Sequence, residues 1–171
     1  MARVALVTGG TRGIGKAIVQ RLNEDGVVCQ WMPIYQISPQ RLRSAVATFL
    51  YVFPEASLWY VANHALLIAK KHASRIDYEA LARRLEDPTV REDLASIDIP
   101  SAESLLSHLI MGPAELQAYV DAGGDVPLNS DAFPYLEYFV PRDLFHGPLD
   151  NVREMVPHLA NPSDYVERLP P

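Results

Sequence analysis

Cysteine and long hydrophobic runs are nearly absent from this sequence of 171 residues. Its one cysteine, Cys29, excludes an internal disulfide framework and a metal site built from several thiolates. The sequence has no stretch near the ~20 apolar residues that a membrane-spanning helix needs, and its short N-terminal apolar run lacks the features of a secretory signal. We therefore expect a cytoplasmic protein in a reducing compartment, without a membrane partner.

Positive charge is also scarce. The chain has 15 Lys and Arg against 21 Asp and Glu, a net charge of −6, whereas nucleic-acid binding requires clustered cations to face the phosphates. We expect small molecules or proteins as partners, and no nucleic acid. The histidines show no metal-ligand spacing, so no metal site is predicted. The five are His64, His72, His108, His146 and His158.

The first third of the chain has the pattern of a β-α-β unit. Residues 4–7 form a continuous apolar run typical of a buried strand, and glycines follow it. Apolar residues at four-residue intervals predict an amphipathic helix over residues 13–24, ended by Gly26. Residues 27–34 predict a second strand, parallel to the first through a right-handed crossover.

The next segment predicts a helix and a hairpin. Ser38 and Pro39 are typical of a helix start, a side-chain cap followed by proline, and the apolar spacing continues to residue 53. Residues 57–61 and 65–69 predict two strands separated by three residues, a link that is long enough only for an antiparallel hairpin.

The rest of the chain is more polar. Helices are expected at residues 78–86, 101–109 and 113–121, the last closed by two glycines. Prolines and aromatic residues dominate from residue 125 onward, which predicts extended or irregular chain packed on the domain.

A glycine-rich turn stands between the first predicted strand and helix, where backbone N–H groups favour a phosphate. The stretch "VALVTGGTRGIGKAIVQRL" resembles the N-terminus of short-chain dehydrogenases/reductases, and the resemblance covers residues 2–26. It implies that NAD or NADP binds at this turn, with Arg12 near a nucleotide phosphate. The implied cofactor-binding residues are Thr8, Gly9, Arg12, Gly13, Ile14 and Gly15.

The chain departs from that family after Gly26. A dinucleotide site needs a charged residue at the end of the second strand, and "CQWMPIYQ" has none. The family's Tyr-x-x-x-Lys pair is also missing, because no tyrosine, for example Tyr60, Tyr78 or Tyr119, has a lysine four positions later. The alternative interpretation of the turn is a tight strand-to-helix connection without a ligand.

A longer stretch is similar to a second family. The segment "DGVVCQWMPIYQISPQRLRSAVATFLYVFPEASLWYVANHALLIAKK" resembles spermidine synthase-like proteins, the polyamine aminopropyltransferases, as does "PLNSDAFPYLEYFVPRDLF" further on. Together these segments span residues 25–145. The second one matches at Leu128, Asn129, Asp131, Pro134, Leu136 and Glu137.

The second resemblance implies an α/β fold of the Rossmann-like, S-adenosylmethionine-dependent methyltransferase type. We expect a partial three-layer sheet in the order β-α-β-α-β-β, whose last two strands form the antiparallel hairpin. Short helices and an irregular C-terminal tail would follow. In this interpretation residues 1–145 form one domain, made of a reductase-like unit (1–26), a transferase-like sheet (27–71) and a helical and extended part (72–145). Residues 146–171 form the tail.

The resemblance also implies a donor, decarboxylated S-adenosylmethionine, and transfer of its aminopropyl group to an amine. The glycine-rich loop and the carboxylates that this chemistry needs lie in the family before the resembling segment begins, so no catalytic residue is assigned. One wall of a pocket remains, formed by Gln30, Trp31, Tyr35 and Gln36 near a strand end. The alternatives are aromatic core packing for Trp31 and Tyr35, and capping of backbone groups by the glutamines.

We therefore interpret the chain as a chimera, with a reductase-like start joined at residues 23–26 to a transferase-like remainder. The leading functional hypothesis is a catalytically incomplete spermidine synthase-like domain. The first alternative is an NAD(P)-binding reductase fragment. The second is a noncatalytic interaction module, with a homodimer formed through an exposed sheet edge.

Overall fold

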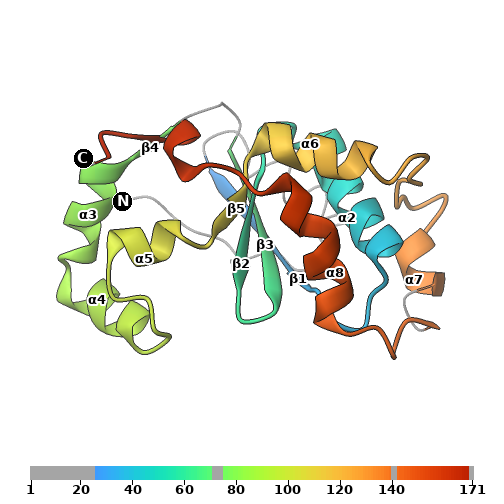
Figure 1. The fold of residues 1–171 in the computed structure, drawn as a ribbon, viewed down its shortest axis with the longest axis horizontal. Coiled ribbons are helices and arrows are strands. Elements are labelled where there is room, and N and C mark those ends of the chain that lie inside the picture. Colours follow the sequence, from blue (N-terminus) through green and yellow to red (C-terminus); the bar gives the residue numbers. More distant parts are fainter. Residues whose placement is uncertain (1–25, 71–74, 140–141, 170–171) are drawn as a thin grey trace.

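The fold is mixed α/β, with a four-stranded sheet, a small two-stranded sheet and several helices (Figure 1). The structure is a computed structural model that describes residues 26–70, 75–139 and 142–169. In chain order its elements are β1 (Val27–Pro33), α2 (Pro39–Val52), β2 (Ser57–Val61), β3 (His64–Lys70), β4 (Ile76–Asp77), α3 (Tyr78–Leu85), α4 (Pro88–Ala95), α5 (Ala102–Leu106), β5 (Leu109–Met111), α6 (Pro113–Asp121), α7 (Tyr135–Phe139), α8 (Pro148–Met155), the 3-10 turns η2 (Val156–His158) and η3 (Pro162–Asp164), and β6 (Val166–Glu167).

The main sheet has the strand order β1-β3-β2-β5, and its neighbours are antiparallel. Strands β2 and β3 form the predicted hairpin, although β3 begins one residue earlier than expected. Ala62 and Asn63 make the two-residue turn with φ angles of 47° and 66°. Positive φ at both central residues is the conformation that matches the twist of a tight hairpin.

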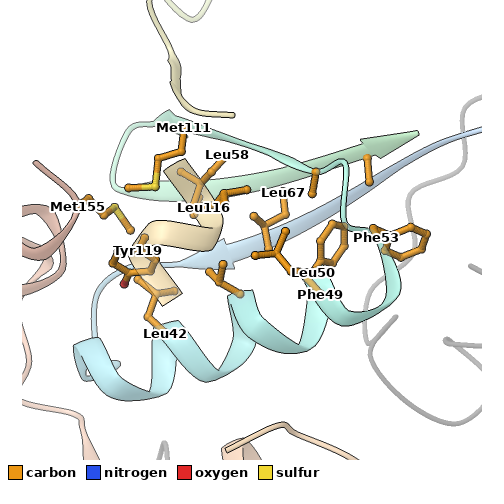
Figure 2. Close-up of a cluster of buried hydrophobic side chains, with 14 of the residues drawn as sticks. Leu42, Phe49, Leu50, Phe53, Leu58, Leu67, Met111, Leu116, Tyr119 and Met155 are labelled. Atoms are coloured by element: carbon orange, nitrogen blue, oxygen red, sulfur yellow. The ribbon is translucent and has the colours of Figure 1, made fainter. Parts of the chain in front are cut away.

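The main core lies between α2 and one face of this sheet (Figure 2). Leu42, Val46, Phe49 and Leu50 are buried along one side of α2, as the spacing predicts, and α2 ends one residue before the predicted boundary. Leu58 of β2 and Leu67 of β3 face them, both fully buried, with Met111, Leu116, Tyr119 and Met155 closing the end of the cluster. Fully burying side chains of this size stabilises a fold by about 1.5–3 kcal/mol each.

The other face of the sheet, which we call the outer face, carries Ser57, Trp59, Ile68 and Leu109. Cross-strand pairing places Ser57 beside Ile68 and Trp59 beside Leu109, whereas Leu58 pairs with Met111 on the core face. Figure 1 shows α3, α4 and α5 on one side of the sheet, and α2, α6 and α8 on the other. The outer face therefore looks toward the α3–α5 segment.

The predicted side-chain cap at the start of α2 is wrong. Ser38 is the N-cap residue of α2, but its side chain makes no capping hydrogen bond. Its N–H instead donates to the carboxylate of Asp143 at 2.7 Å, and Arg41 also bonds that carboxylate. The carboxylate that binds the start of α2 thus belongs to Asp143, a residue 105 positions away, which the local sequence could not indicate.

The predicted helix over residues 101–109 is shorter than expected. It ends at Leu106, and residues 109–111 form β5 instead. The Tyr60 N–H donates to the His108 carbonyl at 2.8 Å, which continues the pairing of β2 with β5. Sheet pairing overrides the helical pattern because it buries Leu109 and Met111. A shift in the register between β2 and β5 places these two side chains on opposite faces of the sheet.

The C-terminal part is more regular than the irregular tail that we expected. Helix α8 lies in the predicted tail and buries Asn151 and Met155. Strand β6 pairs in parallel with β4, ninety residues earlier in the chain. Helix α4 was not predicted either; the carboxylate of Asp87 caps it by accepting from the Thr89 N–H at 2.9 Å.

Only the second strand of the predicted β-α-β unit, β1, lies within the described residues. Its first strand and helix, residues 4–7 and 13–24, lie outside the described residues, so its parallel pairing stays a prediction. Within the described ranges, no helix is both long and apolar enough to cross a membrane.

Candidate functional site

Two of the four predicted pocket residues lie together at the turn end of the hairpin. Trp31 in β1 and Tyr35 in the following loop flank His64, with ring centroids 5.2 and 5.6 Å from the imidazole. Their exposed fractions are 43% and 37%, so neither is an ordinary core residue. The Nδ1 atom of His64 is buried and has no hydrogen-bond partner among the described residues.

The two glutamines contact backbone groups. The Gln30 side chain donates to the Trp31 carbonyl at 2.8 Å. Gln36 has a φ of 56°, and its N–H donates to the His146 carbonyl at 2.8 Å. Gln30 thus makes a backbone contact of the kind that the capping alternative expects. A ligand at the turn end of the hairpin stays a prediction.

The predicted nucleotide-binding turn belongs to the first 25 residues, which precede the described part of the chain. Thr8, Gly9, Arg12, Gly13, Ile14 and Gly15 lie outside the described residues, as does most of the proposed junction at residues 23–26. The NAD or NADP site therefore stays a prediction from sequence.

A cavity of about 540 Å³ lies elsewhere, between the outer face of the sheet and α3. We call it the sheet–α3 cavity. None of the four predicted pocket residues lines it. Its described lining residues are Glu55, Ser57, Trp59, Ile68, Ala69, Lys70, Arg75, Ile76, Leu81, Leu109, Pro113, Asp164 and Tyr165.

The inner wall of this cavity is apolar in character. The Trp59 indole N–H donates to Ser57 Oγ at 3.0 Å, and the Ser57 hydroxyl donates to the Ile68 carbonyl at 3.3 Å. These polar groups are satisfied by one another. A molecule that enters the cavity therefore meets the indole ring and the aliphatic side chains of Ile68, Leu81 and Leu109.

Tyr165 closes the cavity on the side of α6. Its ring lies directly against Gly112, and its hydroxyl donates to the Glu115 carboxylate at 2.6 Å. The same carboxylate accepts from the Gly112 N–H at 3.0 Å, which caps α6. Burial, together with the bond to Glu115, raises the pKa of Tyr165 to about 12. The phenol is therefore neutral at physiological pH.

Arg75 stands at the cavity wall and joins the two chain segments there. Its Nη2 atom donates to the Ser163 carbonyl at 2.6 Å and to the Val166 carbonyl at 2.7 Å, beside the pairing of β4 with β6. Among the described residues, four charged ones line the cavity, namely Glu55, Lys70, Arg75 and Asp164, so both signs are equally represented there.

The lining residues are better suited to binding than to bond making. The described ones include no histidine or cysteine, and the Ser57 hydroxyl donates to a carbonyl rather than to a base. In the described ranges, no group of three histidine, cysteine or acidic side chains could hold a metal ion. Cys29 lies elsewhere, half-buried, and burial raises the pKa of its thiol, which disfavours the reactive thiolate.

The two segments that resemble spermidine synthase-like proteins contact each other. Thr48 Oγ1, from α2, accepts a hydrogen bond from the Asn129 N–H at 2.8 Å. The buried Asn129 side chain accepts from the Leu136 N–H at 2.9 Å and thereby holds the start of α7. Asn129 therefore has a structural role, whereas Asp131 of the same motif is exposed.

Comparisons with known proteins do not assign the chain. No family model, no curated protein and no solved structure matches it. The two resemblances therefore remain interpretations of the quoted stretches.

Sequence reasoning missed the sheet–α3 cavity because its residues come from separate segments, spanning Glu55 to Tyr165. One signal was present in the hairpin. Ser57 and Trp59 alternate with the fully buried Leu58, which predicts that they share the opposite face of the sheet. Nothing local, however, indicates what covers that face.

Proposed function

We propose that the chain is a spermidine synthase-like domain that does not carry out aminopropyl transfer. The observation that carries the proposal is the contact between its two resembling segments. Thr48, Asn129 and Leu136 form one chain of hydrogen bonds across residues that are 81 and 7 positions apart. Segments that derive from one ancestral domain are expected to pack together in this way.

The element order gives further support. Strand β1, helix α2 and the β2–β3 hairpin follow each other as expected for the end of a Rossmann-like sheet, where parallel strands give way to an antiparallel hairpin. The proposal includes this Rossmann-like ancestry, with residues 4–7 supplying the parallel neighbour of β1.

The loss of catalysis follows from what aminopropyl transfer requires. The attacking amine must be deprotonated, and the sulfonium donor must be held with its reactive carbon beside it. The sequence motifs for both tasks are absent. In the sheet–α3 cavity, Glu55 and Asp164 share the lining with Lys70 and Arg75, so the site is not a dedicated anionic pocket for an amine.

The test is an aminopropyl transfer assay with decarboxylated S-adenosylmethionine and putrescine, followed by mass spectrometry of the products. A spermidine synthase with intact motifs is the positive control. If this chain forms no more spermidine than the no-enzyme blank, the proposal is supported. Spermidine formed in proportion to the concentration of this chain overturns it.

A second candidate function is an interaction module that forms a homodimer through the sheet edge. This candidate replaces the proposed pairing of residues 4–7 with β1. Among the described residues, β1 pairs only with β3, and Val27 and Trp31 are 44% and 43% exposed. An edge strand with apolar side chains is a template for pairing with a second chain. Light scattering is expected to give a dimer for the native chain and a monomer for Trp31→Glu, and a monomeric native chain overturns this candidate.

A further inference from the structure

We propose that the sheet–α3 cavity binds a free amino acid with an apolar side chain. The cavity and the charges of its lining carry this inference. It goes beyond the proposed function and does not depend on the ancestry of the domain.

The size and the interior of the cavity favour an apolar body. About 540 Å³ falls within the ~300–1,000 Å³ typical of small-molecule sites. The indole of Trp59 presents its ring rather than its N–H, because Ser57 accepts that N–H. A purely polar ligand would lose its hydration without gaining hydrogen bonds from this wall.

Arg75 provides the carboxylate-binding group. Its Nη2 atom is held by two backbone carbonyls, so the guanidinium is fixed before a ligand arrives. A guanidinium has five N–H donors in a rigid fork, and the donors of Nε and Nη1 are not used by those two bonds. These donors lie on different sides of the guanidinium, so Arg75 can give a carboxylate a single charge-assisted hydrogen bond.

Asp164 provides the complementary group for an ammonium. It follows Ser163, whose carbonyl accepts a hydrogen bond from Arg75, so both charged residues line the same part of the cavity although they are distant in the sequence. Asp164 is exposed, and its backbone N–H donates to the Asn161 carbonyl at 2.9 Å, which fixes the turn that carries the carboxylate. Glu55 adds a second carboxylate to the lining.

The balance of charges distinguishes a zwitterion from simpler ligands. A plain carboxylate would meet Arg75 but would also be repelled by Asp164 and Glu55. A plain amine would meet the carboxylates but would be repelled by Arg75 and Lys70. A ligand that carries both charges on neighbouring atoms can pair each with its opposite while its apolar side chain enters the cavity.

The experiment compares three ligands of similar shape by isothermal titration of the full chain. They are phenylalanine, 3-phenylpropanoate, which lacks the ammonium, and phenethylamine, which lacks the carboxylate. We expect phenylalanine to bind about tenfold more tightly than either of the other two, as two charge-assisted contacts require. The inference is overturned by equal or tighter binding of the amine or the acid, or by no binding of phenylalanine up to about 10 mM.

Two pairs of variants locate the site. Ile68→Trp places an indole inside the cavity. Its control is Leu66→Trp, which changes a half-buried residue on the same face of β3 that does not line the cavity. Asp164→Asn removes the ammonium partner, and Asp125→Asn removes an exposed carboxylate remote from the lining. We expect loss of binding in Ile68→Trp, about tenfold weaker binding in Asp164→Asn, and native affinity in both controls.

Thermal melts of all four variants accompany the titration, so that only folded proteins are compared. Unchanged phenylalanine binding by folded Ile68→Trp or Asp164→Asn shows that the ligand sits elsewhere, and this overturns the inference. Because the aminopropyl transfer assay uses other ligands, its outcome is independent of these titrations.

Discussion

Tyr165 lies so close to Gly112 that no side chain fits between them. A Cβ atom placed on Gly112 would be 2.0 Å from Cζ of Tyr165, well inside the contact distance of two carbon atoms. The glycine is required here for space and not for its backbone conformation, since its φ of −90° is open to any residue. This contact fixes the C-terminal strand β6 to the start of α6 and forms one side of the sheet–α3 cavity.

We expect Gly112→Ala to lower the free energy of unfolding by about 1–3 kcal/mol, because the methyl group must displace the Tyr165 ring and its bond to Glu115. Urea unfolding measures the loss. Gly147→Ala is the matched control, since Gly147 also caps a helix that begins with proline but has no atom within 4 Å of its Cβ position. Equal effects in the two variants would contradict the steric argument.

The Tyr165 phenol predicts a pH dependence at the alkaline end. Burial and the bond to Glu115 raise its pKa to about 12 from the ordinary value of 10.0. A raised pKa in the folded state means that the neutral phenol stabilises the fold fully below pH 10 and that this contribution is lost as the pH rises toward 12.

The measurement is the free energy of unfolding of the native chain and of Tyr165→Phe, from about pH 8 to about pH 11. We expect the difference between the two proteins to shrink as the pH rises. Burial also raises the pKa of Tyr119, which is present in both proteins and cancels in the comparison. A constant difference over this range would show that Tyr165 does not titrate as inferred.

Removing the acceptor of the Thr48–Asn129 hydrogen bond should lower the free energy of unfolding. Thr48→Val keeps the shape of the side chain but leaves the buried Asn129 N–H without a partner. An unsatisfied buried donor costs about 1–3 kcal/mol, which denaturant unfolding resolves. Thr89→Val on the exposed α4 is the control and should change stability by less than about 0.5 kcal/mol. A neutral Thr48→Val would remove the main support for the packing of the two resembling segments.

We expect position 151 to require a side-chain amide rather than a carboxylate, because the buried group must donate two hydrogen bonds. Its fully buried Nδ2 atom donates to the Ile34 and Ile37 carbonyls at 2.9 and 2.8 Å. Asn151→Asp would direct an oxygen at one or both carbonyls, so we expect a loss of about 3 kcal/mol or more at neutral pH.

Protonation restores one donor to the carboxyl group that Asn151→Asp introduces, so the loss should diminish as the pH falls below the raised pKa of that group. The check is urea unfolding of the variant and the native chain at about pH 7 and about pH 4. A difference in stability that is the same at both pH values would contradict this role for Asn151.

The local pattern of apolar residues was sufficient to predict α2 and the β2–β3 hairpin. Leu42, Val46 and Phe49 recur with the helical period, and Pro54 stops the pattern, so the helix needs no distant partner to be recognised. The two hairpin strands are adjacent in the chain and joined by two residues, so only one pairing is open to them. In the structure, the apolar face of α2 and the buried residues of β3 belong to the same core.

Residues that are distant in the sequence decided the rest. The partner of the Ser38 N–H is Asp143, the partner of Thr48 is Asn129, and the ring that requires Gly112 belongs to Tyr165. No periodic pattern encodes such contacts, because each depends on how loops return across a finished core. The strand β5 is another case, since its backbone becomes a strand only when β2 offers an edge.

By itself, then, the sequence determined the helix α2, the β2–β3 hairpin and the apolar face between them, because short-range spacing specifies which side chains must leave water. Only the tertiary structure decided that the outer face of the same hairpin is covered by α3 and the C-terminal segment. The sheet–α3 cavity arises from that arrangement. Arg75 and Asp164 both line this cavity because β4 pairs with β6 across ninety residues, a pairing whose energy exists only in the folded chain.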